Sequence, residues 1–178
     1  MWLHLRRGIV TALLPLVFCH GAWAADPIDE DKVKAAIIYN LLLFVEWPES
    51  PAPARSLRLC VLEDGALTSA LRAHEGRRVG GVALEVHRLH GIHQELDTCA
   101  AVMVEAGGMG VLARLGVAAR NRPLLVIAEG SDAAARGAMI GLHTDGGRIA
   151  FDINYGAMKR SGLVPSSKIL RLARTLIE

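Results

Sequence analysis

The sequence predicts an α/β fold, a single-domain α/β sandwich whose mixed, mostly parallel sheet carries helices on both faces and ends in a C-terminal hairpin plus helix. Three observations predict it. Helical and strand patterns alternate along the chain. Residues 124–128 form a continuous apolar run, which is typical of a buried parallel strand. Asp145-Gly146-Gly147 separates two strand-like runs and indicates a hairpin.

The individual elements follow from local patterns. The first is a nearly all-apolar helix that ends at the aromatic-proline corner Trp47-Pro48. Ser131 is expected to cap a short helix, and Pro165 begins the approach to the last one. In chain order, we expect a helix in 33–48, a strand at 57–62, a helix at 66–74, a basic glycine-rich turn at 76–81, strands at 83–89 and 96–105, a helix at 110–119, a strand at 124–128, a helix at 131–136, hairpin strands at 138–143 and 148–154, and a helix at 167–177.

The N-terminus has the features of a cleaved secretory signal peptide over residues 1–24, which leaves residues 25–178 as the domain. Two arginines precede an apolar run at 9–18, and small residues at positions 22 and 24 fit a cleavage site. The run is short for a membrane span. We therefore expect a periplasmic protein with no stable membrane insertion after cleavage, with a retained N-terminal anchor as the alternative.

Composition narrows the choice of partner. The net charge is +2, whereas nucleic acids and anionic membrane surfaces select proteins with large basic patches. We therefore expect no nucleic-acid partner. Aromatic residues make up only 4% of the chain, so the core is expected to be aliphatic. The mature chain is long enough to bury such a core without a metal or several disulfides.

The cysteines predict one disulfide. Cys19 leaves with the signal peptide, so the mature chain retains the pair Cys60 and Cys99. In an exported protein an even pair is typical of a disulfide, and both cysteines lie at predicted strands whose ends can be neighbours. Closing the loop between them would stabilise the fold by about 4 kcal/mol in the chain-entropy model. No C-x-x-C motif is present, so a structural bridge is favoured over a redox-active pair.

One motif is compatible with an enzyme. Gly108-x-Gly110-x-x-Ala113 follows an apolar strand and opens a helix, and Glu129 follows at the spacing of a dinucleotide-binding turn. The motif belongs to an internal strand, however, and export removes the protein from nicotinamide pools. Glycines are common at such turns for backbone reasons alone, so a tight strand-to-helix turn is the favoured interpretation.

Other reactive side chains are better explained by turns and loops. His87, His90 and His93 lie close together where a strand ends, and imidazoles at such spacing can bind zinc or copper. No cysteine or carboxylate completes a ligand set nearby, so solvated loop histidines are favoured. Glu63-Asp64 and Asp145 suit turns and caps. Because no nucleophile elbow, phosphate-binding loop or zinc-protease motif is present, we expect a non-enzyme with no metal and no cofactor.

Two features are candidates for binding another protein. Lys168, Arg171 and Arg174 would form a basic stripe on the last helix. Such a stripe is either the solvated face of the helix or a docking edge for an acidic partner. Trp47 is either a core plug beneath the Pro48 loop or an exposed anchor of an interface, and the plug is favoured.

A different function class remains open, in which the chain binds a small ligand. Asn40, Arg122 and Asn154 are the polar residues that would line a crevice at the carboxyl ends of the strands, where α/β sheets commonly bind ligands. A ligand binder would show a rise in melting temperature with some small molecule. A chain whose partner is a membrane protein would instead co-purify with that protein.

Sequence blocks in one order carry a family resemblance that extends from Val33 to about Arg174. The blocks are Lys34-Ala35-Ala36, Tyr39-Asn40, Phe44-x-Glu46-Trp47-Pro48, Leu57-Arg58-Leu59-Cys60-Val61, Gly76-Arg77-Arg78-Val79, Cys99, Arg122-Pro123-Leu124-Leu125, Gly137-x-Met139-Ile140, Arg148-Ile149-x-Phe151-x-Ile153-Asn154, Gly162-Leu163 and Ser166-Ser167-Lys168-Ile169-Leu170-x-Leu172-Ala173-Arg174. With these blocks the chain resembles the YfiR family, small periplasmic regulators of membrane diguanylate cyclases.

The resemblance implies a non-enzymatic α/β regulator, often a homodimer. It would bind the periplasmic region of an inner-membrane diguanylate cyclase, repress the enzyme, lower cyclic di-GMP and oppose biofilm formation. The family's bridging cysteines correspond to Cys60 and Cys99. A second cysteine pair of some members is absent from residues 134–141, so redox switching through it is not expected. The alternative is a periplasmic small-ligand binding module that feeds a different membrane sensor.

Overall fold

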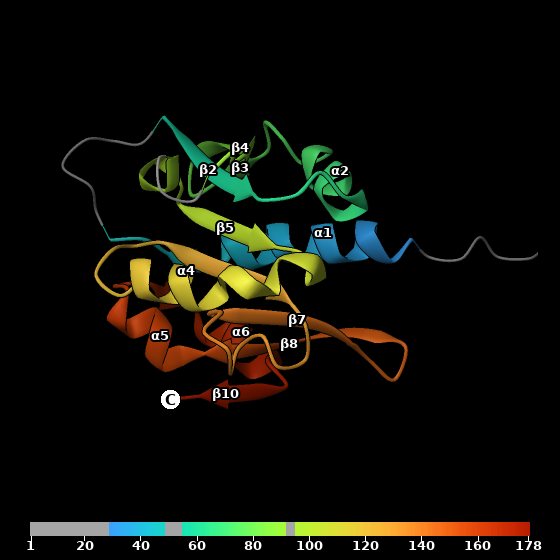
Figure 1. Ribbon diagram of the computed structural model, residues 1–178, viewed down its shortest axis with the longest axis vertical. Helices are drawn as coiled ribbons and strands as arrows, with labels where there is room; N and C mark the ends of the chain where they lie inside the picture. Colours follow the sequence, from blue (N-terminus) through green and yellow to red (C-terminus); the bar gives the residue numbers. More distant parts are fainter. Residues whose placement is uncertain (1–28, 49–54, 92–94) are drawn as a thin grey trace, which may run out of the picture.

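An eight-stranded, curled sheet with helices on both faces forms the frame of the protein, which confirms the expected α/β fold class (Figure 1). The structure is a computed structural model that describes residues 29–48, 55–91 and 95–178. The predicted signal peptide and His93 lie outside the described residues. No helix of the described part of the chain is long and apolar enough to cross a membrane.

The element bounds are as follows. The helices are α1 (Glu30–Leu43), α2 (Ala66–Arg72), α4 (Leu112–Ala118), α5 (Tyr155–Arg160) and α6 (Ser167–Leu172), with 3-10 helices η1 (Leu96–Thr98) and η2 (Ala106–Val111). The strands are β1 (Val45–Glu46), β2 (Ser56–Val61), β3 (Arg78–Val79), β4 (Val82–Arg88), β5 (Ala101–Val104), β6 (Leu125–Glu129), β7 (Ile140–Asp145), β8 (Arg148–Asn154), β9 (Val164–Pro165) and β10 (Thr175–Ile177).

The large sheet has the strand order β10-β8-β7-β6-β5-β2-β4-β3, and β1 and β9 form a separate two-stranded ribbon. Strands β4, β2, β5, β6 and β7 are mutually parallel, and β8 runs antiparallel to β7. The predicted turn between β7 and β8 is confirmed. Gly146 and Gly147 have φ of +55° and +77°, a backbone conformation that suits glycine and matches the twist of a two-residue hairpin.

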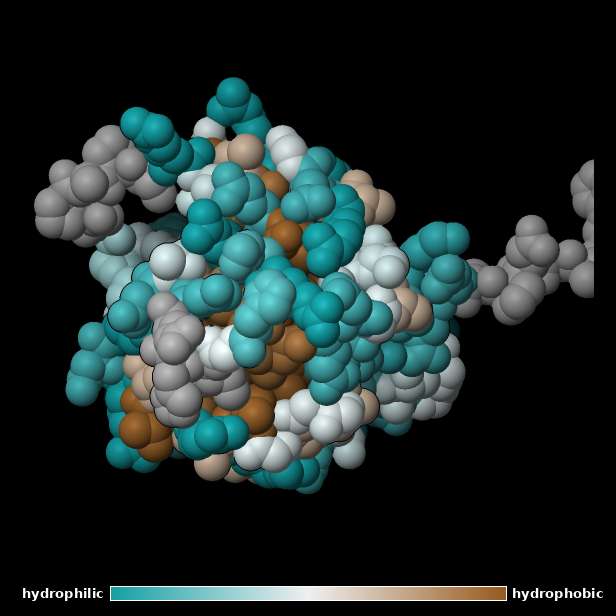
Figure 2. Space-filling model, turned by 45° about the horizontal axis from the view of Figure 1, so that its top comes forward, coloured by the Kyte–Doolittle hydropathy of each residue, from teal (hydrophilic) through white to brown (hydrophobic). Residues whose placement is uncertain are grey.

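The helices divide between the two faces of the sheet. Helices α1 and α2 contact each other, and α1 and α6 together with Phe151 enclose one hollow, so these three helices share a face. Helices α4 and α5 enclose a second hollow on the other face, in front of the sheet in Figure 1. The face seen in Figure 2 is largely hydrophilic, with hydrophobic side chains gathered near its middle.

The core is aliphatic, as expected. Its largest fully buried side chains are mostly leucine and isoleucine and come from α1, α2, α4 and the central strands. The disulfide is also confirmed. Cys60 on β2 is bonded to Cys99, which lies two residues before β5. Their Cα atoms are 5.8 Å apart. Both cysteines are buried, so the bridge fastens two neighbouring parallel strands from within the core.

Helix α1 begins after a capping aspartate and ends earlier than expected. The Asp29 side chain accepts a hydrogen bond from the Lys32 backbone N–H (3.4 Å), and acidic residues occupy the first turn. The helix ends at Leu43 rather than near Pro48. Val45 is drawn out of the helix because it pairs with Pro165 in the β1–β9 ribbon, a contact between distant segments.

Two short predictions were wrong for local reasons. The strand expected at 96–105 begins only at Ala101, because η1 forms first, with Thr98 Oγ1 donating to the Glu95 carbonyl (2.8 Å). The helix expected at 131–136 is a series of turns. The Arg136 N–H donates to the Asp132 carbonyl (3.0 Å), but Gly137 follows with φ +112° and stops further helix.

The C-terminus differs most from expectation. Helix α6 ends at Leu172, and residues 175–177 form β10, parallel to β8. Ala173 is extended, and the Arg174 N–H donates to the Phe151 carbonyl (2.9 Å), so a contact with the sheet overrides the helical pattern. Helix α5 and the short strands β1, β3 and β9 were not predicted.

Candidate functional site

The polar residues expected to line one crevice lie apart. Arg122 precedes β6 and donates a hydrogen bond to Asp97 (2.6 Å). Asn154 ends β8, where its side-chain oxygen accepts from the Ala157 N–H (2.8 Å) and caps α5. Asn40 is exposed on α1. Because β8 is antiparallel to β7, Arg122 and Asn154 both lie at the amino edge of the parallel strands. The predicted crevice at the carboxyl ends, built from these three residues, is therefore wrong.

Trp47 lies at the same amino edge. Its ring is half-buried and packs against the core, and its indole N–H donates to the Ala100 carbonyl just before β5 (3.2 Å). The indole N–H is therefore satisfied internally, which fits the favoured interpretation of a plug.

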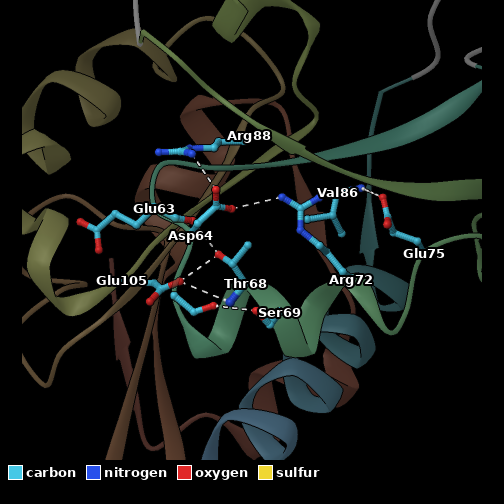
Figure 3. Close-up of polar contacts among 10 residues, drawn as sticks. Glu63, Asp64, Thr68, Ser69, Arg72, Glu75, Val86, Arg88 and Glu105 are labelled. Atoms are coloured by element: carbon cyan, nitrogen blue, oxygen red, sulfur yellow. Dashed lines mark hydrogen bonds and ion pairs between the residues drawn. The ribbon is translucent and has the colours of Figure 1, made fainter.

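The carboxyl edge of the sheet, where α/β folds often bind anions, carries carboxylates instead (Figure 3). Glu105, just after β5, accepts hydrogen bonds from the Thr68 N–H (3.3 Å) and hydroxyl (2.9 Å) in the first turn of α2. A Cβ added at Gly65 would collide with the Glu105 carboxylate, so glycine is required for this approach. The start of α2 is thus capped by the protein itself.

The acidic pair Glu63-Asp64 has a mainly structural setting. Asp64 accepts from Arg72 (3.2 Å) and from Arg88 (2.6 Å), as Figure 3 shows. All three side chains are more than two-fifths exposed, and such ion pairs contribute little to stability. The Glu63 carbonyl oxygen also lies 2.9 Å from the Thr68 hydroxyl, whose single proton it shares with Glu105. These contacts support the interpretation of turn and cap residues.

The glycine-rich turn after β5 is occupied by Glu129. One Glu129 oxygen accepts from the Ala106 N–H at the start of η2 (3.2 Å), and the other lies 2.7 Å from Lys34 Nζ. Burial would lower the pKa of Lys34, but its hydrogen bonds to Glu129 and to Glu30 outweigh burial and raise that pKa. A carboxylate held in this way is an internal cap rather than a free ligand for a ribose, so the geometry favours the tight-turn interpretation of Gly108-x-Gly110.

The histidines do not gather around a common point. His87 Nε2 lies 3.5 Å from Glu95, and His90 is exposed. Within residues 29–48, 55–91 and 95–178, no group of three or more His, Cys, Asp or Glu side chains is placed to hold a metal ion.

A hollow between α1 and α6 is an apolar surface feature that several elements build together. We call it the α1–α6 hollow; its volume is about 400 Å³ and its lining residues are Ile37, Asn40, Leu41, Phe44, Phe151, Lys168, Ile169 and Leu172. Leu172 is 63% exposed at its edge. Leu172 and the apolar lining thus form one continuous contact surface.

The rim of the α1–α6 hollow is basic. Lys168 Nζ lies 4.5 Å from the centroid of the Phe44 ring, and Arg171 is exposed on the same helix. The predicted stripe is nevertheless shorter than expected. Arg174 lies beyond α6 and binds Asp152 instead (3.1 Å). Asn40 is at the hollow, so one predicted ligand residue belongs here.

Sequence reasoning missed the apolar residues of this hollow. Phe151 lies on β8 and Leu172 at the end of α6, and only the folded sheet brings them beside α1. No local pattern in the last segment singled out Leu172, and only Ile169 is buried within α6.

Fold and surface together define a small α/β domain with an apolar hollow between α1 and α6. Comparison with known protein families identifies the family of this domain. Residues 31–174 match the YfiR/HmsC-like family model, and the chain belongs to that family.

One of two similar solved structures supports the fold. A conserved domain protein from Vibrio cholerae O1 biovar El Tor is similar with a TM-score of 0.52 and 13% identity, over 82% of this chain and 60% of that one. A domain from Streptococcus pneumonia, crystallised in complex with L-Trp, has a TM-score of 0.48 and 10% identity, over 83% of this chain and 62% of that one. The chain thus spans about three-fifths of the length of these structures, and the likeness to the Vibrio protein concerns the fold alone.

Proposed function

We propose that this chain is a periplasmic, non-enzymatic regulator that binds the periplasmic region of an inner-membrane diguanylate cyclase, represses it and lowers cyclic di-GMP. Family membership over residues 31–174 supports a regulatory rather than a catalytic role. The export signal expected in residues 1–24 supports the compartment.

The observation that carries the proposal is the α1–α6 hollow. It offers aromatic and aliphatic side chains from three elements, and Leu172 extends that surface into solvent. Interfaces owe most of their binding energy to a few such residues clustered at a depression. A partner side chain seated between Phe44 and Phe151 would be removed from water, which makes the contact favourable.

Charge at the rim indicates the chemistry of the partner. Lys168 lines the α1–α6 hollow, Arg171 is exposed one turn further along α6, and Arg174 is already neutralised by Asp152. A partner surface with an apolar centre and carboxylates around it would complement this arrangement, and such complementarity raises specificity and association rate more than affinity.

The experiment that tests the proposal compares cyclic di-GMP in the native host with the gene present, deleted and restored. Repression predicts that the level rises on deletion and returns when the wild-type gene is restored. In parallel, the tagged protein should capture an inner-membrane protein with a cyclase domain from solubilised membranes. An unchanged level of cyclic di-GMP on deletion would contradict the proposal.

A further inference from the structure

A second cavity lies on the face of the sheet opposite to the α1–α6 hollow. It has a volume of about 320 Å³ and is enclosed by α4, by the turns at residues 131–137 and by α5. Three arginines, Arg120, Arg136 and Arg160, come from these three segments and line it. Its size is at the lower end of the range for small-molecule sites.

The charged side chains that line this cavity are all basic. Among the residues that the structure describes, no acidic side chain lines it. Arg136 has only long contacts, 3.5 Å to Asp132 and 3.4 Å to the Met109 carbonyl. Arg120 and Arg160 have no ion pair or hydrogen bond from their side chains to another described residue. Three like charges around one concavity repel each other, and an anion bound between them would remove that repulsion.

The walls of the cavity are held in place by other contacts. A Cβ added at Gly116 would lie 3.3 Å from the Gly137 carbonyl oxygen, so two glycines let α4 approach the turn closely. Asn154 fixes the remaining wall, because its amide donates to the Ala134 carbonyl (3.1 Å) while its oxygen caps α5. Met139, which is 2% exposed, provides an apolar floor. The cavity is therefore formed without a ligand.

The geometry points to a binding site for a small multivalent anion, one that presents several phosphate or carboxylate oxygens to Arg120, Arg136 and Arg160. Guanidinium groups bind such oxygens through paired, charge-assisted hydrogen bonds. The apolar floor at Met139 accommodates a short carbon skeleton. This site lies apart from the α1–α6 hollow, so the proposal does not depend on the repression of a cyclase.

Calorimetric titration of the full mature chain with pyrophosphate and, separately, with citrate tests this site. Sodium chloride at matched ionic strength is the control for nonspecific screening. We expect saturable binding of at least one of the two anions, and the tighter one identifies the oxygen chemistry. Arg120→Gln and Arg160→Gln should each weaken binding about tenfold or more, since each removes a charge-assisted contact.

Two further variants keep the test sharp. Arg114→Gln removes the same charge from an exposed position of α4 that does not line the cavity, and it should leave the affinity unchanged. Ala135→Glu places a carboxylate at the exposed edge of the cavity and should abolish binding without touching the core. Failure of both anions to bind the wild type, or equal weakening by Arg114→Gln, would overturn the proposal.

Discussion

The Arg174 guanidinium donates two hydrogen bonds to the buried carboxylate of Asp152, with Nε–Oδ1 at 3.2 Å and Nη2–Oδ2 at 3.1 Å. This pair joins the segment after α6 to β8 and places β10 at the edge of the sheet. It also removes Arg174 from the surface charge that Lys168 and Arg171 present. The shape of the C-terminal surface beside the α1–α6 hollow therefore depends on one bidentate contact.

Replacement of Arg174 should destabilise the fold. Arg174→Ala leaves the Asp152 carboxylate, which is 4% exposed, without its two guanidinium donors, so the variant should unfold at a lower urea concentration than the wild type. Arg171→Ala is the matched control, because Arg171 is exposed and makes no such contact with a described residue. Urea unfolding followed by circular dichroism measures both. Equal stability of the two variants would contradict the structural role of the pair.

The same pair predicts a dependence of stability on pH. Burial opposes ionisation of Asp152, but the hydrogen bonds from Arg174 outweigh it and hold its pKa below the ordinary value of 3.8. The unfolded chain then binds the proton more readily, so this contribution is fully present above about pH 4 and is lost as the pH falls through the folded pKa. The free energy of unfolding, measured between pH 2.5 and 6 by ~0.5-unit steps, should fall less steeply in Arg174→Ala than in the wild type. If the free energy of unfolding of the two proteins changed with pH in parallel, the pH dependence would not come from the Arg174–Asp152 pair.

Loss of the disulfide should lower stability considerably. In the chain-entropy model, the bridge between Cys60 and Cys99 contributes about 4 kcal/mol. The Cys60→Ala/Cys99→Ala variant and the wild type under reducing conditions should unfold at similar urea concentrations, both lower than that of the oxidised wild type. A reduced wild type as stable as the oxidised protein would show that the bridge is dispensable.

The cap at the carboxyl edge offers a local test. Glu105→Ala leaves the Thr68 N–H without its acceptor at the start of α2, although the Thr68 hydroxyl keeps the Glu63 carbonyl, and the loss of this cap should cost about 1 kcal/mol. Glu85→Ala is a suitable control, since Glu85 has only a 3.5 Å contact with Arg58 at the surface. Chemical denaturation of both variants gives the comparison. A loss in the control as large as in Glu105→Ala would rule out a specific cap.

Local chemistry was sufficient to predict much of the fold. The Asp145-Gly146-Gly147 turn, the buried strand β6 and the paired cysteines each carry their signal in neighbouring residues or in composition. The last segment was misassigned because the helix expected at 167–177 ends at Leu172. Beyond that, Arg174 is committed to Asp152, a contact between segments that no local pattern reveals.

The binding surfaces were harder to predict for the same reason. Asn154 was taken as a ligand residue, whereas it caps α5; an asparagine before a helix is a recognised cap signal. The three arginines of the second cavity lie on separate segments, and only the folded chain brings them to one concavity. Phe151 likewise meets α1 only across the sheet.

The measurement that tests the central claim most directly is cyclic di-GMP in the native host, with the deleted gene restored as wild type, as Leu172→Gln or as Val164→Gln. Leu172 and Val164 are exposed to a similar extent, 63% and 57%, but Leu172 lies at the α1–α6 hollow, whereas Val164 on β9 lines neither that hollow nor the second cavity. The wild type and Val164→Gln should restore the low level, and Leu172→Gln, at equal periplasmic abundance, should not. Full repression by Leu172→Gln would contradict the proposed docking surface.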